Sequence, residues 1–370
     1  MGMRRDDPLR GLRDLQRHGG TPPPLTEPDR GAPPRGPGRP PRGPRRRRRP
    51  LRWIVRGLAL LLVLVLLLVG FVYWQVDRAL DKRRHPVAVS ELKRGEPTNI
   101  LLLGLDSRAN LTPAELKRIA TKETGSKLTD TIIVMQLAPG RDKPVLLSIP
   151  RDLRVERPGN DQKINAMYSI GGPDLLVKTV EQVTGLPIHH VVEIDLAGFL
   201  NVVDTLGGVT LCNDSGKRID DKNANLHMDP GCHEVDGAGA LAFVRSRKFP
   251  NGDFERIAHQ QQFMKAIVKK AASPGSLINV PRTLKLTTQV AGNVTIDDQL
   301  GTFEAIRTAM KLAGGDLDTR VYPSAPAPPA CAGCSAFVEP KKAEAAQLME
   351  ALRRGDKELP PIGEVKQPGA

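Results

Sequence analysis

The apolar positions of the chain form short runs and regularly spaced stripes, which predict alternating strands and helices. Buried strands are expected at residues 100–103, in "DTIIVMQLAP" and in "KPVLLSIP", because each apolar run is short and ends at a turn residue. "HHVVEIDL" and "VTLC" have the same character and predict two further strands.

Helices are predicted between and after these strands. Thr112 and Pro113 open the first, over 112–124, as an N-cap and a proline at the first helical position. The second covers 173–184 and is stopped by Gly185. "AGFLNVVDTLGG" is expected to be capped by Asp195, and "DGAGALAFVRSR" and "DFERIAHQQQFMKAIVKKAA" predict two more helices. Strands and helices alternate without a repeat, which predicts an α/β sandwich.

One apolar run is long enough to cross a bilayer. "GLALLLVLVLLLVGFVYW", residues 57–74, carries no charge over about 18 residues and predicts a transmembrane helix over 51–76. A cleaved signal peptide is the alternative, but bulky Phe71, Tyr73 and Trp74 follow the apolar core where small residues would be expected. Basic residues are more frequent before the run than after it, which places the N-terminus in the cytoplasm and the rest outside the cell membrane.

Charge is concentrated before this helix and in its flanks. The net charge of +14 comes almost entirely from the segment before Pro97, and the remaining chain is close to neutral. Residues 1–50 are rich in Pro, Gly and Arg, and we expect them to form a disordered cytoplasmic arm. Because this arm is short and lies beside a bilayer with anionic lipids, its charge indicates no nucleic-acid partner.

The exterior part is expected to comprise a charged stalk over 77–96, a folded domain over 97–357 and a flexible tail over 358–370. All four cysteines lie in the domain, as suits an oxidising compartment. Four cysteines allow three pairings, and spacing favours Cys212 with Cys232 and Cys331 with Cys334. The second pair, in "CAGC", has two other interpretations, a redox pair and half of a zinc site.

Three predicted strands carry charged side chains at one end. Asp106 and Arg108 follow "ILLLG", Asp130 precedes "TIIVM", and Arg151 and Asp152 follow "LLSIP". A later segment adds four more charged residues: Arg245, Arg247, Asp253 and Arg256. Ligands of open α/β sheets bind where strands end, so these residues are candidates for one site.

Guanidinium groups beside carboxylates suit a ligand with phosphate groups and a bridging divalent cation. Arginine offers a rigid fork to phosphate oxygens, and Mg²⁺ is usually held by one or two carboxylates together with substrate phosphates. Surface ion pairs are the alternative for each residue. Lys163 and Asn165 are either turn residues or part of the site, and His189 and His190 are expected to be structural. The chain has no G-x-G-x-x-G, P-loop, H-E-x-x-H or G-x-S-x-G motif.

Seven motifs in order give the sequence a family resemblance: "NILLLGLDSR", "LTDTIIVMQL", "LLSIPRDLRV", "KINAMYSIGG", "FLNVVDTLGGVTL", "LAFVRSR" and "GDFERIAHQQQ". Together they closely resemble the LytR-CpsA-Psr family of membrane-anchored cell-wall enzymes, strongly over about 97–270 and more loosely to about 357. The resemblance implies a three-layer α/β/α sandwich with a central mixed sheet and an apolar pocket for a polyprenyl chain.

The resemblance also implies roles for the charged residues. Asp106 and Asp130 would serve the metal, Mg²⁺ or Mn²⁺. The pyrophosphate would be bound by the arginines: Arg108, Arg151, Arg245, Arg247 and Arg256. Arg151, Asp152 and Asp253 would be catalytic, the two carboxylates by orienting arginines or accepting a proton. His259 departs from the family, which commonly has a second Arg before "QQ".

The implied reaction is transfer of a glycopolymer from a polyprenyl-pyrophosphate carrier to a sugar hydroxyl of peptidoglycan. In this reaction the hydroxyl attacks the phosphorus nearest the polymer and polyprenyl phosphate leaves. Two alternatives remain at this point. In a pyrophosphatase, water would replace the sugar hydroxyl, and in a non-catalytic protein the chain would only bind polyprenyl lipids or wall polymer.

Overall fold

A computed structural model describes residues 49–119, 129–157, 161–246, 253–271, 288, 290–312, 316–327 and 336–362 of the chain, with side chains from Ile54 onward and without those of 253–255. Several predictions therefore lie outside the described residues. They are the disordered arm before residue 49, Arg247, the side chain of Asp253, and the Cys331–Cys334 pair.

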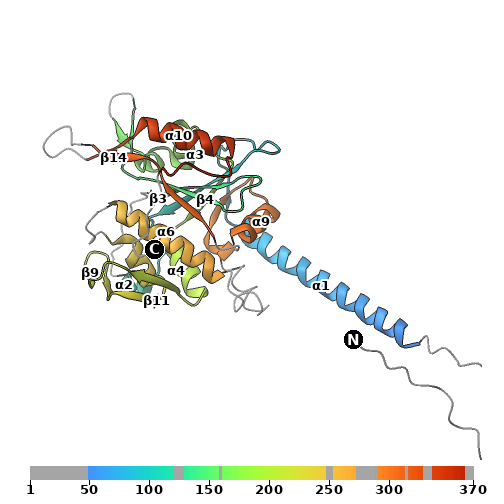
Figure 1. The fold of residues 1–370 in the computed structure, drawn as a ribbon. Helices are drawn as coiled ribbons and strands as arrows, with labels where there is room; N and C mark the ends of the chain where they lie inside the picture. The colour runs from blue at the N-terminus through green and yellow to red at the C-terminus, as the bar shows by residue number, and fades with distance from the viewer. Residues whose placement is uncertain are drawn as a thin grey trace, which may run out of the picture. The chain divides into compact units, whose positions relative to one another are not determined.

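The core of the fold is a seven-stranded mixed sheet in the order β1-β12-β7-β2-β3-β4-β13 (Figure 1). Its strands are β1 (Arg84–His85), β2 (Thr98–Leu105), β3 (Thr129–Leu137), β4 (Val145–Ile149), β7 (His190–Ile194), β12 (Thr295–Asp297) and β13 (Asp318–Val321). β7 runs parallel to β2 and β13 parallel to β4, whereas β3 is antiparallel to both of its neighbours. The four long strands confirm the apolar runs as strands; β1, β12 and β13 were not predicted.

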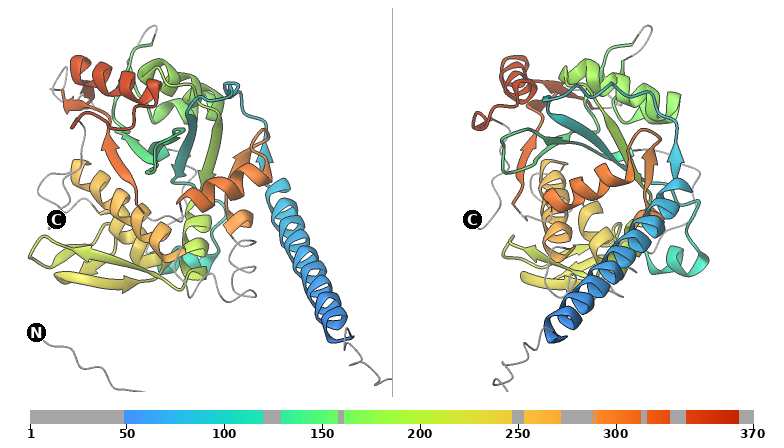
Figure 2. Two further views of the ribbon diagram at one scale, coloured as in Figure 1. Left: turned by 45° about the vertical axis from the view of Figure 1, so that its right-hand side comes forward. Right: turned by 90° about the vertical axis from the view of Figure 1, so that its right-hand side faces the viewer.

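Helices cover both faces of this sheet and make it a three-layer sandwich, as predicted (Figures 1 and 2). On one face lie α3 (Ala166–Thr184) and α10 (Lys342–Arg354), and on the other lie α4 (Leu196–Thr205), α5 (Gly237–Arg245) and α6 (Asp253–Ala271). The alternation along β2 explains both contacts, because successive strand residues point to opposite faces. Leu101 and Leu103 pack towards α3 and α10, whereas Ile100 packs towards α6.

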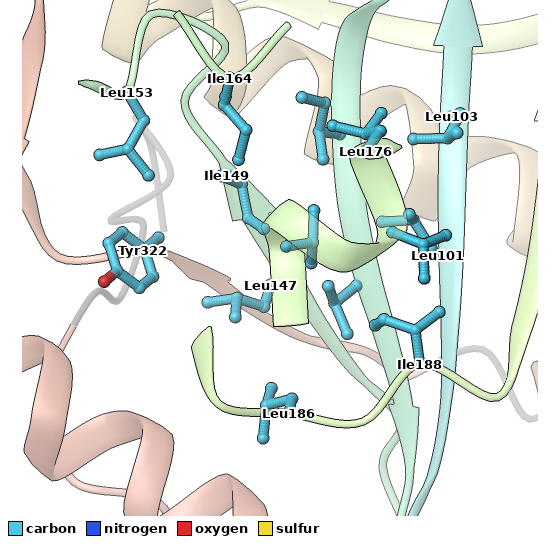
Figure 3. Packing of buried hydrophobic residues seen from close by; sticks show 14 of the residues in the cluster. Leu101, Leu103, Leu147, Ile149, Leu153, Ile164, Leu176, Leu186, Ile188 and Tyr322 are labelled. Carbon is cyan, nitrogen blue, oxygen red and sulfur yellow. The ribbon is translucent and has the colours of Figure 1, made fainter. Parts of the chain in front are cut away.

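The face under α3 holds the largest apolar cluster. Figure 3 shows Leu101 and Leu147 of the sheet together with Leu176 of α3 and Leu186 of the following loop. α3 begins at Ala166, earlier than the predicted 173, because a kink at Gly171 and Gly172 joins a short first segment to the predicted helix. Gly185 ends α3 in the left-handed conformation that favours glycine, as predicted.

The remaining predicted elements are present with small changes in their ends. Asp195 caps α4 by accepting a hydrogen bond from the amide of Gly198, as predicted. α2 (Pro113–Arg118) begins with a capping box formed by Thr112 and Glu115, and the rest of the predicted 112–124 helix lies outside the described residues.

Beneath α5 and α6 the chain forms two nested hairpins, of which sequence reasoning found only the first strand. β8 (Val209–Asn213) pairs antiparallel with β11 (Gly231–Val235), and β9 (Ile219–Asp221) pairs with β10 (Leu226–Met228) between them. Cys212 and Cys232 are directly opposite in the outer pair and form a disulfide, which confirms the predicted pairing.

Four short strands form two small antiparallel pairs near the face of the sheet that α3 covers. β5 (Arg154–Val155) pairs with β6 (Gln162–Lys163), and β14 (Ser324–Pro326) pairs with β15 (Val338–Pro340). The helix α9 (Thr302–Leu312) lies between β12 and β13 in the chain.

The long apolar run lies in the helix α1 (Arg49–Asp81), and residues 54–81 are long and apolar enough to cross a membrane. The segment expected to be a stalk follows it. Part of that segment is built into the domain, because β1 pairs with β12 and Val87 is buried in the cluster under α3.

Candidate active site

A cavity of about 380 Å³ lies where β2, β3 and β7 meet α4, α5 and α6. One part of its wall is polar and carries Asp106, Asp130, Arg245, Arg256 and Gln260. Another part is apolar and carries Leu105, Ile194, Leu196, Phe199, Leu241 and Val244. The cavity therefore offers charged groups and an apolar surface to the same ligand. Four of the charged residues predicted from the strand ends and the later segment meet here.

A β-bulge places the carboxylate of Asp130. Gly104 pairs with Thr131 and Leu105 pairs with Thr129, so Asp130 is the extra residue between two paired positions. A bulge of this kind bends the strand and redirects the side chain of the unpaired residue. The strands approach closely here, because a Cβ added to Gly104 would lie 2.9 Å from the Cβ of Thr131. Glycine at 104 thus allows the approach that sets Asp130 near the end of β2, where Asp106 follows.

Arg151 is held beside Asp130, directly after β4. Its guanidinium donates a hydrogen bond of 2.7 Å to a carboxylate oxygen of Asp130, and its Nε lies 3.7 Å from Asp152. The ammonium group of Lys163 lies 2.8 Å from the other oxygen of Asp152. Asp152 is therefore placed between two cations, an arrangement that orients Arg151. Lys163, for which the sequence left a turn role open, belongs to this network.

The arginines on the helical side are positioned from two elements. Arg245 lies in the last turn of α5, and the next residue, Ser246, is fully buried and donates a 2.8 Å hydrogen bond to Asp221. Asp221 itself ends β9, so the inner hairpin fixes the end of α5 next to the cavity. Arg256 belongs to α6 and is buried, with 4% of its surface exposed. An arginine so little exposed at a cavity wall is suited to contact a bound anion and not bulk water.

α6 is fixed in register by a glutamine in its interior. Gln261 is almost completely buried, and its amide nitrogen donates hydrogen bonds to the hydroxyl of Ser148 on β4 and to the carbonyl of Arg320 on β13. These bonds attach α6 to two strands of the sheet. They thereby hold Arg256 and Gln260 against the cavity.

His259 supplies packing and no charge. Its ring lies against the ring of Phe243, with 4.4 Å between the centroids, and only 8% of its surface is exposed. Burial lowers the pKa of His259 to about 4, so the imidazole is neutral at physiological pH. At the position where the family commonly has an arginine, this chain therefore has an uncharged side chain.

Asp106 and Asp130 fit a divalent cation. Both carboxylates line the cavity, and Oδ1 of Asp106 is buried without a hydrogen-bond partner among the described residues, whereas Oδ2 lies 3.4 Å from Arg108. Within the described ranges no group of three or more His, Cys, Asp and Glu side chains forms a metal cage. Mg²⁺ commonly needs only one or two carboxylates together with substrate phosphates, and two are present here.

Sequence reasoning missed several residues of the site. Asp221, Asn223, Phe199 and Gln260 line the cavity, but none of them stands at the end of a predicted sheet strand. The "QQ" of the last motif was a signal for Gln260. Asp221 and Asn223 gave none, because the inner hairpin was not recognised in the sequence.

Most of the chain is similar to cell-wall proteins. Residues 74–319 match the LytR_cpsA_psr family. The chain is 38% identical over 275 residues to the probable cell wall biosynthesis protein LcpB of Corynebacterium glutamicum, a match that spans 73% of this chain and 66% of LcpB. It is 33% identical over 264 residues to TagU of Bacillus cereus, a polyisoprenyl-teichoic acid–peptidoglycan teichoic acid transferase, over 68% of this chain and 81% of TagU.

The fold is also similar to a solved structure. The crystal structure of Bacillus subtilis TagV aligns over 72% of this chain and 100% of TagV, with a TM-score of 0.58 and 26% identity. These matches confirm the family resemblance and the layered architecture that the seven motifs predicted.

Proposed function

This chain belongs to the LytR-CpsA-Psr family, and on that premise we propose that it transfers a glycopolymer from a polyprenyl-pyrophosphate carrier to a peptidoglycan hydroxyl. The transfer is a phosphotransferase reaction, in which a phosphodiester forms and polyprenyl phosphate leaves. TagU, a relative of 33% identity, is named for a reaction of this class.

The observation that carries the proposal is the mixed wall of the cavity. A polyprenyl-pyrophosphate ligand has a strongly anionic head and an apolar chain, and the cavity offers a suitable surface to each. Arg245 and Arg256 face the place of the head, whereas Leu196, Phe199 and Leu241 offer apolar surface to the first part of the chain. A ligand that is only anionic or only apolar would contact just one of the two parts of the wall.

The residues of the site have separable roles in this reaction. Arg245 and Arg256 bind phosphate oxygens and balance the charge that develops as the bond to the leaving polyprenyl phosphate breaks. Arg151 is held by Asp130 and Asp152 and needs little reorganisation to contribute in the same way. Asp152 already lies beside the cationic groups of Arg151 and Lys163, so its arrangement supports the orienting role more than the role of proton acceptor.

A divalent cation, Mg²⁺ or Mn²⁺, would be held by Asp106 and Asp130. When bound, it would supply charge neutralisation to the pyrophosphate oxygens. Asp106 has a buried oxygen available for this, and Arg151 remains on Asp130 as a second source of positive charge. Removal of divalent cations should therefore lower transfer strongly while the fold persists.

The helix α1 would anchor the protein in the cell membrane. It provides the one candidate span among the described residues, and the basic residues before it favour a cytoplasmic N-terminus. The domain with the cavity would then face the cell wall, where both peptidoglycan and polyprenyl-linked polymer are available.

The proposal is tested with the full chain in lipid nanodiscs, a polyprenyl-pyrophosphate-linked glycopolymer and peptidoglycan fragments. Arg256→Ala is expected to lower kcat/KM for transfer by about a hundredfold or more, because a buried charge aimed at the cavity is lost. Arg218→Ala is the matched control, since Arg218 is an exposed arginine on the hairpin paired with Asp229. Release of free polymer without wall-linked product would identify a pyrophosphatase, and binding without turnover would identify a carrier.

A further inference from the structure

The surface of α9 carries the most exposed large apolar side chains of the domain. Outside α1, four such side chains stand out in the described part of the chain, and the two most exposed are Phe303 and Met310, each 71% exposed. Both belong to α9. They are seven residues apart, which is two helical turns, so they point to the same side of the helix.

α9 is amphipathic in the opposite sense to an ordinary surface helix. In such a helix the large apolar residues face the core and the polar ones face water. Here the side chains packed against the domain's apolar clusters are Ala305 and Leu312. Phe303 and Met310 face outward, with the half-buried Ile306 between them on the same stripe. The outward stripe therefore lacks a partner within the described chain.

Basic residues flank this outward stripe. Arg307 and Lys311 are exposed and follow Phe303 and Met310 along the helix by four and one residues. The acidic residue of the helix, Glu304, is partly exposed at the edge of this side, and its carboxylate lies 3.5 Å from Nε2 of His190. The exposed side of α9 thus combines apolar side chains with positive charge, a combination that fits an anionic lipid surface.

α9 is fastened to the end of the candidate membrane span. Val76 and Leu80 of α1 are buried in a cluster to which Leu300 and Ala305 belong. In addition, the hydroxyl of Thr302 donates a hydrogen bond to the carboxylate of Asp77. The first turn of α9 is therefore held at the level of Asp77 along α1.

That level lies next to the membrane surface. Phe71, Tyr73 and Trp74 are exposed aromatic residues at the end of the apolar run, where aromatic side chains mark the bilayer interface. Asp77 follows Trp74 by three residues, which is about 4.5 Å along the helix axis. The contacts of α1 with the domain even include Val72, which lies among these aromatic residues. The first turn of α9 is thus held within about one helical turn of the interface.

We propose that α9 is a second membrane contact of this protein. Phe303 and Met310 enter the boundary between lipid headgroups and acyl chains, and Arg307 and Lys311 contact the phosphates of anionic phospholipids. The inference rests on the membrane anchoring in the proposed function. A second contact limits rotation of the domain about α1, and so it fixes the direction in which the cavity faces the bilayer that holds polyprenyl carriers.

The position of α9 next to the end of α1 favours the lipid bilayer as the partner of its exposed apolar side. A second copy of the chain or another protein would need a surface that matches this stripe in shape. The bilayer, in contrast, is already brought to α9 by the aromatic residues at the end of α1. The positive charge of Arg307 and Lys311 adds attraction to anionic lipids.

Photo-crosslinking in nanodiscs tests this contact on the full chain. Benzoylphenylalanine replaces Phe303, Tyr73 or His227, one position at a time, in discs that contain phosphatidylglycerol. Tyr73 is the positive control in the anchor, and His227, an exposed residue of β10, is the negative control. We expect mass spectrometry to find phospholipid adducts at 303 and 73, each at least ten times the yield at 227. Phe303 is mostly exposed, so its replacement disturbs little packing.

The outcomes separate this inference from the anchoring itself. Adducts at Tyr73 with only background at Phe303 would overturn the second contact and leave the anchor in place. Absence of adducts at Tyr73 would overturn the anchoring and the inference built on it. Adducts at Phe303 to another protein chain would overturn the lipid assignment. Arg307→Gln with Lys311→Gln should lower the lipid yield at 303 about threefold, to the value found in discs of phosphatidylcholine alone; an unchanged yield would refute the role of the two basic residues.

Discussion

Asp152 lies between two cations, and this position bears on a question that its sequence neighbours left open. An adjacent Arg and Asp at a strand end is equally typical of a surface ion pair and of a site. In the structure the pair is linked to Asp130 on one side and to Lys163 on the other. The strand ends were readable from the apolar runs. Lys163 was not, because its role depends on the turn that brings β6 back against residue 152.

Lys163→Met should lower kcat for transfer by about tenfold to a hundredfold while the protein stays folded. Without the ammonium group, Asp152 competes with Asp130 for Arg151, and the guanidinium of Arg151 shifts. A small misplacement of a positioned catalytic group lowers the rate by a factor of this order. Lys163→Arg should restore most of the rate, and Lys217→Met, at an exposed position, should have no effect. Steady-state kinetics with circular dichroism checks this; an equal loss in Lys217→Met would contradict it.

His259 should make stability depend on pH. The pKa of His259 is lowered from 6.5 to about 4 by burial, so the unfolded chain takes up a proton at higher pH than the folded chain. The contribution of neutral His259 to the free energy of unfolding is fully present above pH 6.5 and is lost as the pH falls towards 4. By pH 5 the loss amounts to about 2 kcal/mol.

Denaturant unfolding at pH 7.5 and pH 5 measures this loss. His259→Phe, which keeps a ring beside Phe243, should remove about 2 kcal/mol of the difference between the two pH values. The same pH dependence in the variant and in the parent would show that other groups cause it.

The bulge in β3 shows what strand prediction can and cannot give. Short apolar runs that end at turn residues identified β2 and β3, and their ends bracket the site. The register between them is a property of the pair, and neither strand alone contains a signal for an extra residue at Asp130. The hairpin β9–β10 was missed for a related reason, because its strands are only three residues long and too short for a period to show.

Gly104→Ala should disturb the site through this bulge. The new Cβ would lie 2.9 Å from the Cβ of Thr131, so the strands must separate locally, at a cost of about 1–3 kcal/mol. Because the bulge sets the direction of Asp130, transfer activity should fall as well. Thr131→Gly in the same chain removes the clashing atom and should restore part of the stability and part of the transfer activity. Thermal unfolding and transfer assays compare the single and double variants, and a double variant worse than the sum of its parts would argue against the bulge.

The periodicity of apolar residues in the sequence does not predict how α1 contacts the domain. The apolar run itself is evident in the sequence, but a helix that is apolar on all sides has no stripe that identifies the side facing protein. Besides Val192 of β7, the apolar partners of α1 come from residues 291–305, more than 200 positions further along the chain. A contact of this kind arises only when the edge of the sheet is assembled, with β12 joining β1 to β7.

The end of α1 should therefore be part of the folded domain and more than a tether. Leu80 is 4% exposed in the cluster with Ile296 and Leu300, so Leu80→Ala should lower the stability of the domain by about 2–5 kcal/mol. Leu66→Ala removes the same atoms from the exposed part of the same helix and should leave domain unfolding unchanged. Thermal unfolding of both variants in nanodiscs, followed by near-ultraviolet circular dichroism, compares them directly. Equal transition temperatures would mean that α1 only holds the domain at the membrane, whereas a lower one for Leu80→Ala would mean that the anchor and the fold depend on each other.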